Sequence, residues 1–136
     1  MLVVALTACQ GSFEAPSLTN PRDPANGDLP PTPAVIAQAE PCLPSNPPTI
    51  KVDWSIANTP GLTGFQIYRA SSGAEDPGLL VASVAADRRT FTDGTSPGVP
   101  GLSEQTTYWY RVRALDREGL PGLRSAPDST TTFDCL

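Results

Sequence analysis

The sequence predicts an all-β protein, a two-sheet sandwich of seven strands behind a proline-rich, disordered N-terminal tail. Three features lead to this prediction: a period-two alternation, seven short strand-like runs separated by turn residues, and prolines concentrated near the start. Ten of the 16 prolines lie between Gln10 and Pro48, where a backbone so interrupted cannot form a sheet interior. We therefore expect a linker over residues 10–40 and one domain over residues 41–136.

The clearest strand is expected at residues 108–115, where two sets of side chains alternate. The set expected to face a core is Tyr108, Tyr110, Val112 and Ala114. The set expected to face mostly water is Trp109, Arg111, Arg113 and Leu115. Residues 116–119 then form a turn, in which Gly119 can take a positive φ. Leu102 lies six residues before Tyr108, a spacing typical of a tyrosine corner, in which the hydroxyl group bonds to upstream backbone.

The other strands are expected at shorter runs with the same alternation. Their ranges are 49–56, 64–70, 79–85, 89–93 and 125–133. Residues 34–39 either begin a further strand or form a short helical turn. Trp54 should face the core in the first of these runs. In the second run, Phe65 and Ile67 should point inward, with Gln66 and Tyr68 outward.

Several of these stretches resemble the fibronectin type III family in its bacterial surface form. Residues 106–119 are similar to the family's F strand and F–G turn, and Trp54 matches the position of its core tryptophan. The run Phe-Gln-Ile-Tyr-Arg at residues 65–69 looks like the Tyr-x-Val-Tyr-Arg run of bacterial members. The resemblance implies an immunoglobulin-like, seven-stranded sandwich with Cys42 late in its first strand.

The first nine residues resemble a bacterial lipoprotein signal. Leu6-Thr7-Ala8-Cys9 is similar to a lipobox, in which the cysteine carries a diacylglycerol, and an apolar run precedes it. The run is short and has no Lys or Arg before it, so we expect a clipped signal whose true start lies upstream. The alternative is that residues 1–8 form an ordinary buried apolar segment and that Cys9 is a free thiol.

The chain has three cysteines, an odd count that needs an explanation in an exported protein. Lipidation of Cys9 would leave Cys42 and Cys135 as a pair. The resemblance implies that the first and last strands run in the same direction, so that both cysteines lie at one pole. We expect them to form a disulfide in an oxidising compartment; the alternative is two unpaired thiols.

Composition argues against several functional classes. The net charge is −5 and neither part of the chain is basic, so nucleic acid is not an expected partner. The sequence has no histidine, no glycine-rich phosphate loop and no nucleophile elbow, so no Ser-His-Asp triad can form within it. Glu75 and Asp76 are adjacent but fall in a polar loop. We expect no enzymatic activity, no cofactor and no metal site.

One surface is expected to make contacts. The outward residues of two neighbouring strands form it, and we call this set the contact face: Gln66, Tyr68, Trp109, Arg111 and Arg113. Trp, Tyr and Arg dominate interface hot spots, and a flat aromatic ring can stack on a sugar. The alternative is that the arginines only cover the aromatic rings through cation–π contacts.

The expected function is therefore that of a non-catalytic lipoprotein of the cell envelope, in the outer membrane or at the cell surface. One fibronectin type III-like module would contact an unidentified envelope protein or surface glycan, and Cys9 would hold it at the membrane. The competing interpretations are a structural accessory subunit of a larger envelope, surface-layer or pilus complex, and a carbohydrate-binding accessory to a separate enzyme.

Overall fold

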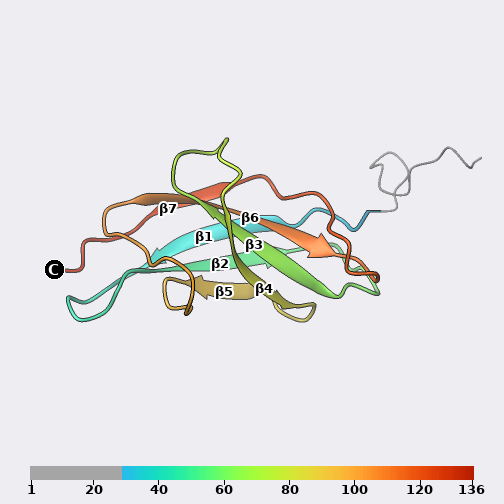
Figure 1. Cartoon of the computed structure of the whole chain (residues 1–136), viewed down its shortest axis with the longest axis horizontal. Coiled ribbons are helices and arrows are strands. Elements are labelled where there is room, and N and C mark those ends of the chain that lie inside the picture. Colours follow the sequence, from blue (N-terminus) through green and yellow to red (C-terminus); the bar gives the residue numbers. More distant parts are fainter. Residues whose placement is uncertain (1–28) are drawn as a thin grey trace, which may run out of the picture.

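The computed structural model describes residues 29–136, which form seven antiparallel strands in two packed sheets (Figure 1). The strands are β1 (Ala34–Glu40), β2 (Thr49–Ser55), β3 (Gly64–Ala70), β4 (Leu79–Ala85), β5 (Thr90–Asp93), β6 (Thr107–Leu115) and β7 (Asp128–Thr131). One sheet has the order β1-β2-β5 and the other β4-β3-β6-β7. The predicted all-β sandwich of seven strands is confirmed.

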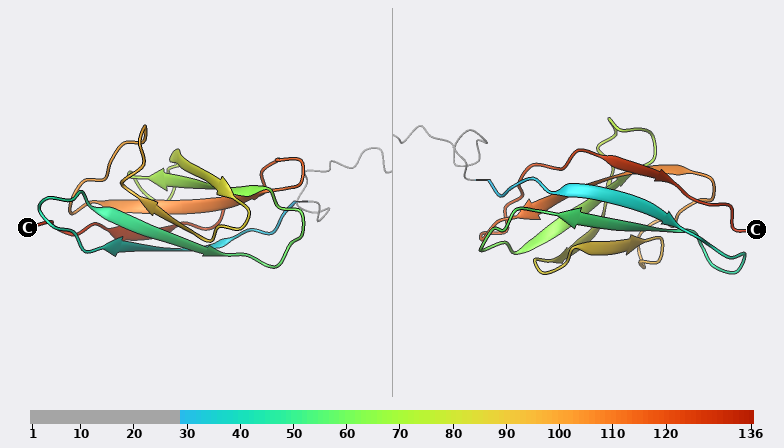
Figure 2. Two further views of the ribbon diagram at one scale, coloured as in Figure 1. Left: turned by 90° about the horizontal axis from the view of Figure 1, so that it is seen from below. Right: turned by 180° about the vertical axis from the view of Figure 1, so that it is seen from behind.

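The two sheets lie face to face, and most of their loops lie at the two ends of the molecule (Figure 2). The chain reaches β1 at one end, which we call the N-terminal pole, and the C-terminus lies at the other, the C-terminal pole. Strand direction places the loops over residues 41–48 and 94–106 at the C-terminal pole, whereas the loop over residues 71–78 rises beside the sheet between the two poles (Figure 1). Residues 56–63, 86–89 and 116–127 form the loops of the N-terminal pole.

The core confirms the alternation predicted from the sequence. On β6, every second residue from Tyr108 to Ala114 is buried, and the residues between them are half-buried. Trp54 is 4% exposed and packs against Phe65, with ring centroids 5.5 Å apart. The β3–β4 pairing skips Val81, and this β-bulge allows Val81 to face the core beside its neighbour Ala82.

The predicted tyrosine corner is present. The backbone N–H of Ser103 donates to the hydroxyl oxygen of Tyr108 over 2.9 Å, and Leu102 packs into the core nearby. The turn after β6 also forms as predicted: Gly119 has a φ of 80°, and its N–H donates to the carbonyl of Asp116 over 2.9 Å.

The predicted boundary between linker and domain lies too late in the sequence. Residues 34–40 were assigned to the linker, but they form β1, which pairs along its whole length with β2. The helical-turn alternative for residues 34–39 is wrong for the same reason. The preceding residues also belong to the domain, because Pro30 is buried and a Cβ added to Gly122 would lie 2.8 Å from its Cγ. The predicted linker residues 10–28 lie outside the described residues.

The last strand is shorter than predicted, spanning Asp128–Thr131 within the expected range 125–133. Two of its side chains reach β1 across the gap between the sheets. The Ala37 N–H donates to Asp128 Oδ2 over 2.8 Å, and the Ala39 N–H donates to Thr130 Oγ1 over 3.2 Å. These backbone N–H groups of β1 point away from β2, and side-chain oxygens of β7 accept their hydrogen bonds in place of a backbone ladder.

The predicted disulfide is confirmed. Cys42 and Cys135 are bonded at the C-terminal pole, with their Cα atoms 5.0 Å apart. Cys42 lies two residues beyond the end of β1, not within the strand as expected. The first and last strands run in the same direction, so the segments that follow them meet at this pole.

Candidate functional site

The contact face lies on the outer side of the sheet β4-β3-β6-β7. Register pairs Gln66 with Arg113, Tyr68 with Arg111, and Ala70 with Trp109. Side chains alternate across a strand, so the inward Phe65 and Ile67 leave Gln66 and Tyr68 on the opposite surface. The structure therefore brings together all five residues that the sequence placed on this face.

Tyr68 lies on the outer face as predicted, but it is not available there. Its side chain is buried, because the guanidinium carbon of Arg124 lies 3.6 Å from the ring centroid and that of Arg113 lies 5.1 Å away. Gln66 Oε1 accepts hydrogen bonds from the Tyr68 hydroxyl over 3.1 Å and from Arg113 Nε over 2.8 Å. Arginines therefore cover Tyr68 through cation–π contacts, as the alternative interpretation expected, and Arg124 is a partner that the sequence did not predict.

Trp109, which was predicted to be exposed, is half-buried. A narrow crevice beside it is lined by Asp76 and Pro77 from the loop 71–78 and by Arg111. Two arginines hold this loop against the sheet. Arg111 donates to the carbonyl of Ala74, and Arg124 Nη1 donates to the carbonyl of Pro77 over 2.6 Å. The loop thus covers part of the contact face, where Trp109, Arg111 and Arg113 are half-buried.

The arginines of the contact face have no acidic partners in the described part of the chain. Residues 29–136 contain two ion pairs, Lys51 with Asp53 and Arg69 with Asp93, and neither involves Arg111, Arg113 or Arg124. Asp76 lies at the end of the face near Trp109, but its carboxylate accepts the N–H of Gly78 over 2.9 Å. That backbone hydrogen bond is the main reason why the pKa of Asp76 lies below its usual value. Its neighbour Glu75 is exposed, as expected for a polar loop.

A second polar cluster lies inside the sandwich and was missed in the sequence. Arg69 Nη1 and the Tyr110 hydroxyl both donate to Asp93 Oδ2, over 2.8 Å and 2.7 Å. Arg69 Nη2 donates to the carbonyl of Pro100 over 2.7 Å, and the Gly94 N–H donates to Asp93 Oδ1 over 2.8 Å. Alternation could have revealed it, because Arg69 and Asp93 each lie two residues after an inward residue, Ile67 and Phe91.

This internal cluster joins strands of both sheets, and its groups pair with one another. Burial raises the pKa of Tyr110 above its ordinary value of 10.0, and the charge and hydrogen bond of Asp93 raise it further. Because Asp93 is 1% exposed and Tyr110 is fully buried, a ligand cannot reach these groups without unfolding. We interpret the cluster as structural.

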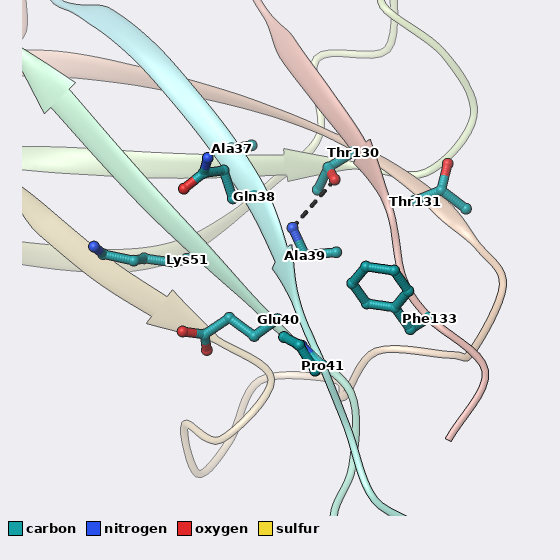
Figure 3. A pocket seen from close by; sticks show the side chains of 9 residues that line it. All are labelled: Ala37, Gln38, Ala39, Glu40, Pro41, Lys51, Thr130, Thr131 and Phe133. Carbon is teal, nitrogen blue, oxygen red and sulfur yellow. Dashed lines mark hydrogen bonds between the residues drawn. The ribbon is translucent and has the colours of Figure 1, made fainter. Parts of the chain in front are cut away.

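A groove of about 430 Å³ lies between β1 and β7 and was not predicted (Figure 3). Most of its polar side chains are engaged within the protein. Thr130 accepts from the Ala39 N–H, Glu40 accepts from Thr49 Oγ1 over 2.8 Å, and Lys51 pairs with Asp53 over 3.4 Å. Phe133 stands at the rim and is 50% exposed. The groove is open to solvent, and most of its polar side chains already have partners within the protein.

The lipidation candidate Cys9 lies outside the described residues. Within residues 29–136, no three His, Cys, Asp or Glu side chains come together in a way that could hold a metal ion. No helix in that range is long and apolar enough to cross a membrane.

No known family profile matches the chain. Solved structures with a similar fold include a fibronectin type III domain of human KIAA0970, with a TM-score of 0.54 at 18% identity, covering 74% of this chain and 72% of that one. The FN1–FN3 domains of chicken CNTN1 match with a TM-score of 0.54 at 18% identity, over 76% of this chain and 32% of that one. Pectate lyase PelI from Erwinia chrysanthemi, in complex with tetragalacturonic acid, matches with a TM-score of 0.54 at 17% identity, over 73% of this chain and 28% of that one.

These comparisons show the fold. The chain has a fibronectin type III-like β-sandwich, as the resemblance in the sequence implied. It spans about a third or less of the CNTN1 and pectate lyase chains that it matches.

Proposed function

We propose that this protein is an exported lipoprotein of the cell envelope, held by an acyl chain on Cys9, that displays one fibronectin type III-like module. The module makes non-catalytic contacts with a protein or glycan through the contact face. The observation that carries the proposal is the disulfide between Cys42 and Cys135.

The disulfide supports export because such bonds persist in oxidising compartments and are rare in the cytosol. It also accounts for two of the three cysteines in the sequence, and Cys9 is the third. Cys9 follows Leu6-Thr7-Ala8, the run that resembles a lipobox. One feature of the fold and one feature of the sequence therefore support the same compartment.

The direction of the chain favours display of the module. A tether that leaves from the N-terminal pole would direct the C-terminal pole away from the membrane. The contact face runs along the side of the sandwich between the two poles, so an envelope partner could reach it. Its polar groups differ from those of the β1–β7 groove, because its arginines lack acidic partners among the described residues.

The anchor is tested by membrane fractionation of cells that produce the protein. Wild-type protein should be found with the membranes and should accumulate as an uncut precursor when lipoprotein signal processing is inhibited with globomycin. Cys9→Ala should release it into the soluble fraction. Cys9→Ala protein that stays in the membrane fraction would contradict the lipoprotein assignment.

The contact role is tested by capture of envelope proteins and glycans on tagged protein. Trp109→Ala should abolish retention of the partner and should change the free energy of unfolding by no more than about 1 kcal/mol. Phe133→Ala is the control, because it removes an aromatic ring from a different surface of the domain. Equal loss in both variants would mean that the contact face has no special role. A partner that stays bound to both would favour the structural-subunit interpretation.

A further inference from the structure

The contact face carries an unbalanced positive charge. Arg111 and Arg113 belong to it, Arg124 packs on its Tyr68, and none of the three makes an ion pair with a described residue. Residues 29–136 as a whole carry eleven acidic and eight basic side chains, a formal charge of −3. The domain as a whole is therefore acidic, but no acidic side chain of the described residues forms an ion pair with these three arginines.

Two of these cations are held close together. Arg113 and Arg124 both pack on the ring of Tyr68, so their like charges repel each other. Hydrogen bonds to Gln66 and to the carbonyl of Pro77 hold them in place. Arg113 donates only through Nε among the described residues, so both of its terminal nitrogens are available to an acceptor. A planar guanidinium held in this way matches the two oxygens of a carboxylate.

We infer that the contact face binds a linear polysaccharide that carries carboxylate groups, an inference that rests on the contact role proposed above. Trp109, Arg111 and Arg113 occupy successive outward positions of β6, about 6.7 Å apart, since two strand residues rise by that distance. They form a straight row in which arginines can pair with carboxylates. The indole of Trp109 at the end of the row is half-buried, and its exposed part can contact a sugar ring.

The charge distribution favours a slender polymer over an anionic membrane. A bilayer presents a broad negative surface, which would also approach the acidic side chains of a domain with a net charge of −3. A single polymer chain can follow the arginines alone. Asp76 stands at the Trp109 end of the row, so the carboxylates should pair mainly with Arg113 at the other end and with Arg124, which packs on the same Tyr68 ring as Arg113.

The test uses the full chain and immobilised polygalacturonate, which has one carboxylate on each sugar, with biolayer interferometry at low ionic strength. Binding should weaken by at least about tenfold when the salt concentration is raised to about 0.5 M, because salt screens exposed charges. Fully methyl-esterified polygalacturonate, which keeps the sugar rings and loses the charges, should bind at least about tenfold more weakly.

Paired variants separate the contact face from overall charge. Arg113→Gln with Arg124→Gln should weaken binding at least about tenfold, since both guanidinium partners are lost. Arg88→Gln with Arg117→Gln is the matched control: it removes the same charge from exposed loops and should change the affinity less than about twofold. Arg113→Lys with Arg124→Lys keeps the charge and should give an intermediate loss, because lysine cannot pair through a planar fork. Circular dichroism checks that each variant is folded.

The inference would be overturned if the protein bound the methyl ester as tightly as polygalacturonate, or if the folded double glutamine variant bound polygalacturonate as tightly as wild type. It would also be overturned if the loop control lost as much affinity as the double glutamine variant. Finally, it would be overturned if the protein bound anionic phosphatidylglycerol vesicles or polyglutamate in place of polygalacturonate. If polygalacturonate fails to bind while Trp109→Ala still abolishes capture of an envelope partner, this inference falls and the proposed function stands. If Cys9→Ala stays with the membranes, the anchor falls, whatever the polysaccharide result.

Discussion

Tyr108 and Tyr110 lie two residues apart on β6 and face the same side, yet their hydroxyl groups have opposite hydrogen-bond roles. The Tyr108 hydroxyl accepts the N–H of Ser103, whereas the Tyr110 hydroxyl donates to Asp93. The hydrogen bond to Tyr108 ties the segment that precedes β6 to the strand. The hydrogen bond from Tyr110 belongs to a buried cluster of charged and polar groups that joins the two sheets.

Tyr108→Phe should lower the free energy of unfolding by about 1–3 kcal/mol, because the Ser103 N–H loses its acceptor in a partly buried position. Urea-induced unfolding monitored by circular dichroism measures the change. The exposed position Thr131 supplies a control: Thr131→Val should stay within about 0.5 kcal/mol of wild type. A Tyr108→Phe protein as stable as that control would show that the corner contributes nothing to stability.

Ionisation of Tyr110 should lower the free energy of unfolding at alkaline pH. Burial and Asp93 raise its pKa in the folded state above the ordinary value of 10.0, so the folded protein keeps a proton that the unfolded chain releases. The stabilisation is complete below pH 10 and is lost as the pH rises further, by up to about 1.4 kcal/mol per pH unit. Unfolding measured between pH 9 and pH 11.5 should show this decline in wild type and a smaller one in Tyr110→Phe. Parallel curves for the two proteins would contradict the assignment.

Trp54 is buried in the core, where its ring packs against Phe65. Trp54→Ala should lower the free energy of unfolding by about 3–5 kcal/mol, as aromatic truncations in cores do. Trp54→Phe should cost less than about 2 kcal/mol. The indole N–H has no hydrogen-bond partner among residues 29–136, so phenylalanine leaves no acceptor unpaired there. Chemical denaturation compares the two variants, and equal losses would show that the indole makes contacts that a smaller ring cannot replace.

At the scale of elements, β1 depends on β7 although the two strands belong to different sheets. The strand β1 bonds to β2 on one side, and on the other its donors meet the side chains of Asp128 and Thr130. This arrangement protects an edge strand without adding a backbone ladder.

Asp128→Ala should therefore loosen β1 locally. The amide of Ala37 loses its acceptor and should exchange with solvent about tenfold faster, as measured by hydrogen exchange with NMR detection. Thr130→Val is the matched control, because it should speed the exchange of Ala39 and leave Ala37 unchanged. An unaltered Ala37 amide in Asp128→Ala would show that other contacts hold β1 in place.

At the scale of the whole molecule, the disulfide joins the end of the chain to the loop after β1. It links residues that are 93 positions apart, so it constrains almost the entire domain in the unfolded state. On the chain-entropy account, such a bond stabilises a domain by about 4 kcal/mol.

Reduction with dithiothreitol should accordingly lower the free energy of unfolding of the wild type by about 4 kcal/mol. The double variant Cys42→Ser with Cys135→Ser should be equally destabilised, and the reductant should have no effect on it. Thermal unfolding with and without reductant makes the comparison. A wild type that is insensitive to full reduction would mean that the unfolded state is compact enough to need no such constraint.

The sequence by itself determined the fold class, the ranges of β3 and β4, the inward side of β6, the tyrosine corner and the disulfide. The strands and the corner depend on local periodicity and on turn residues, which act over a few positions, whereas the disulfide was predicted from the count of cysteines and from the strand directions that the family resemblance implied. The inward placement of Arg69 and Asp93 was also readable, since each follows the alternation of its strand.

Only the tertiary structure decided what depends on contacts between distant segments. The strand β1 was assigned to the linker because prolines are concentrated around it, and its pairing with β2 across the loop 41–48 is not a local property. Tyr68 was correctly placed on the outer face, but its burial depends on Arg124, which lies 56 positions away. The contact face is thus defined by alternation along two strands, whereas its exposure and its unpaired charge are set by which loops and side chains fold over it.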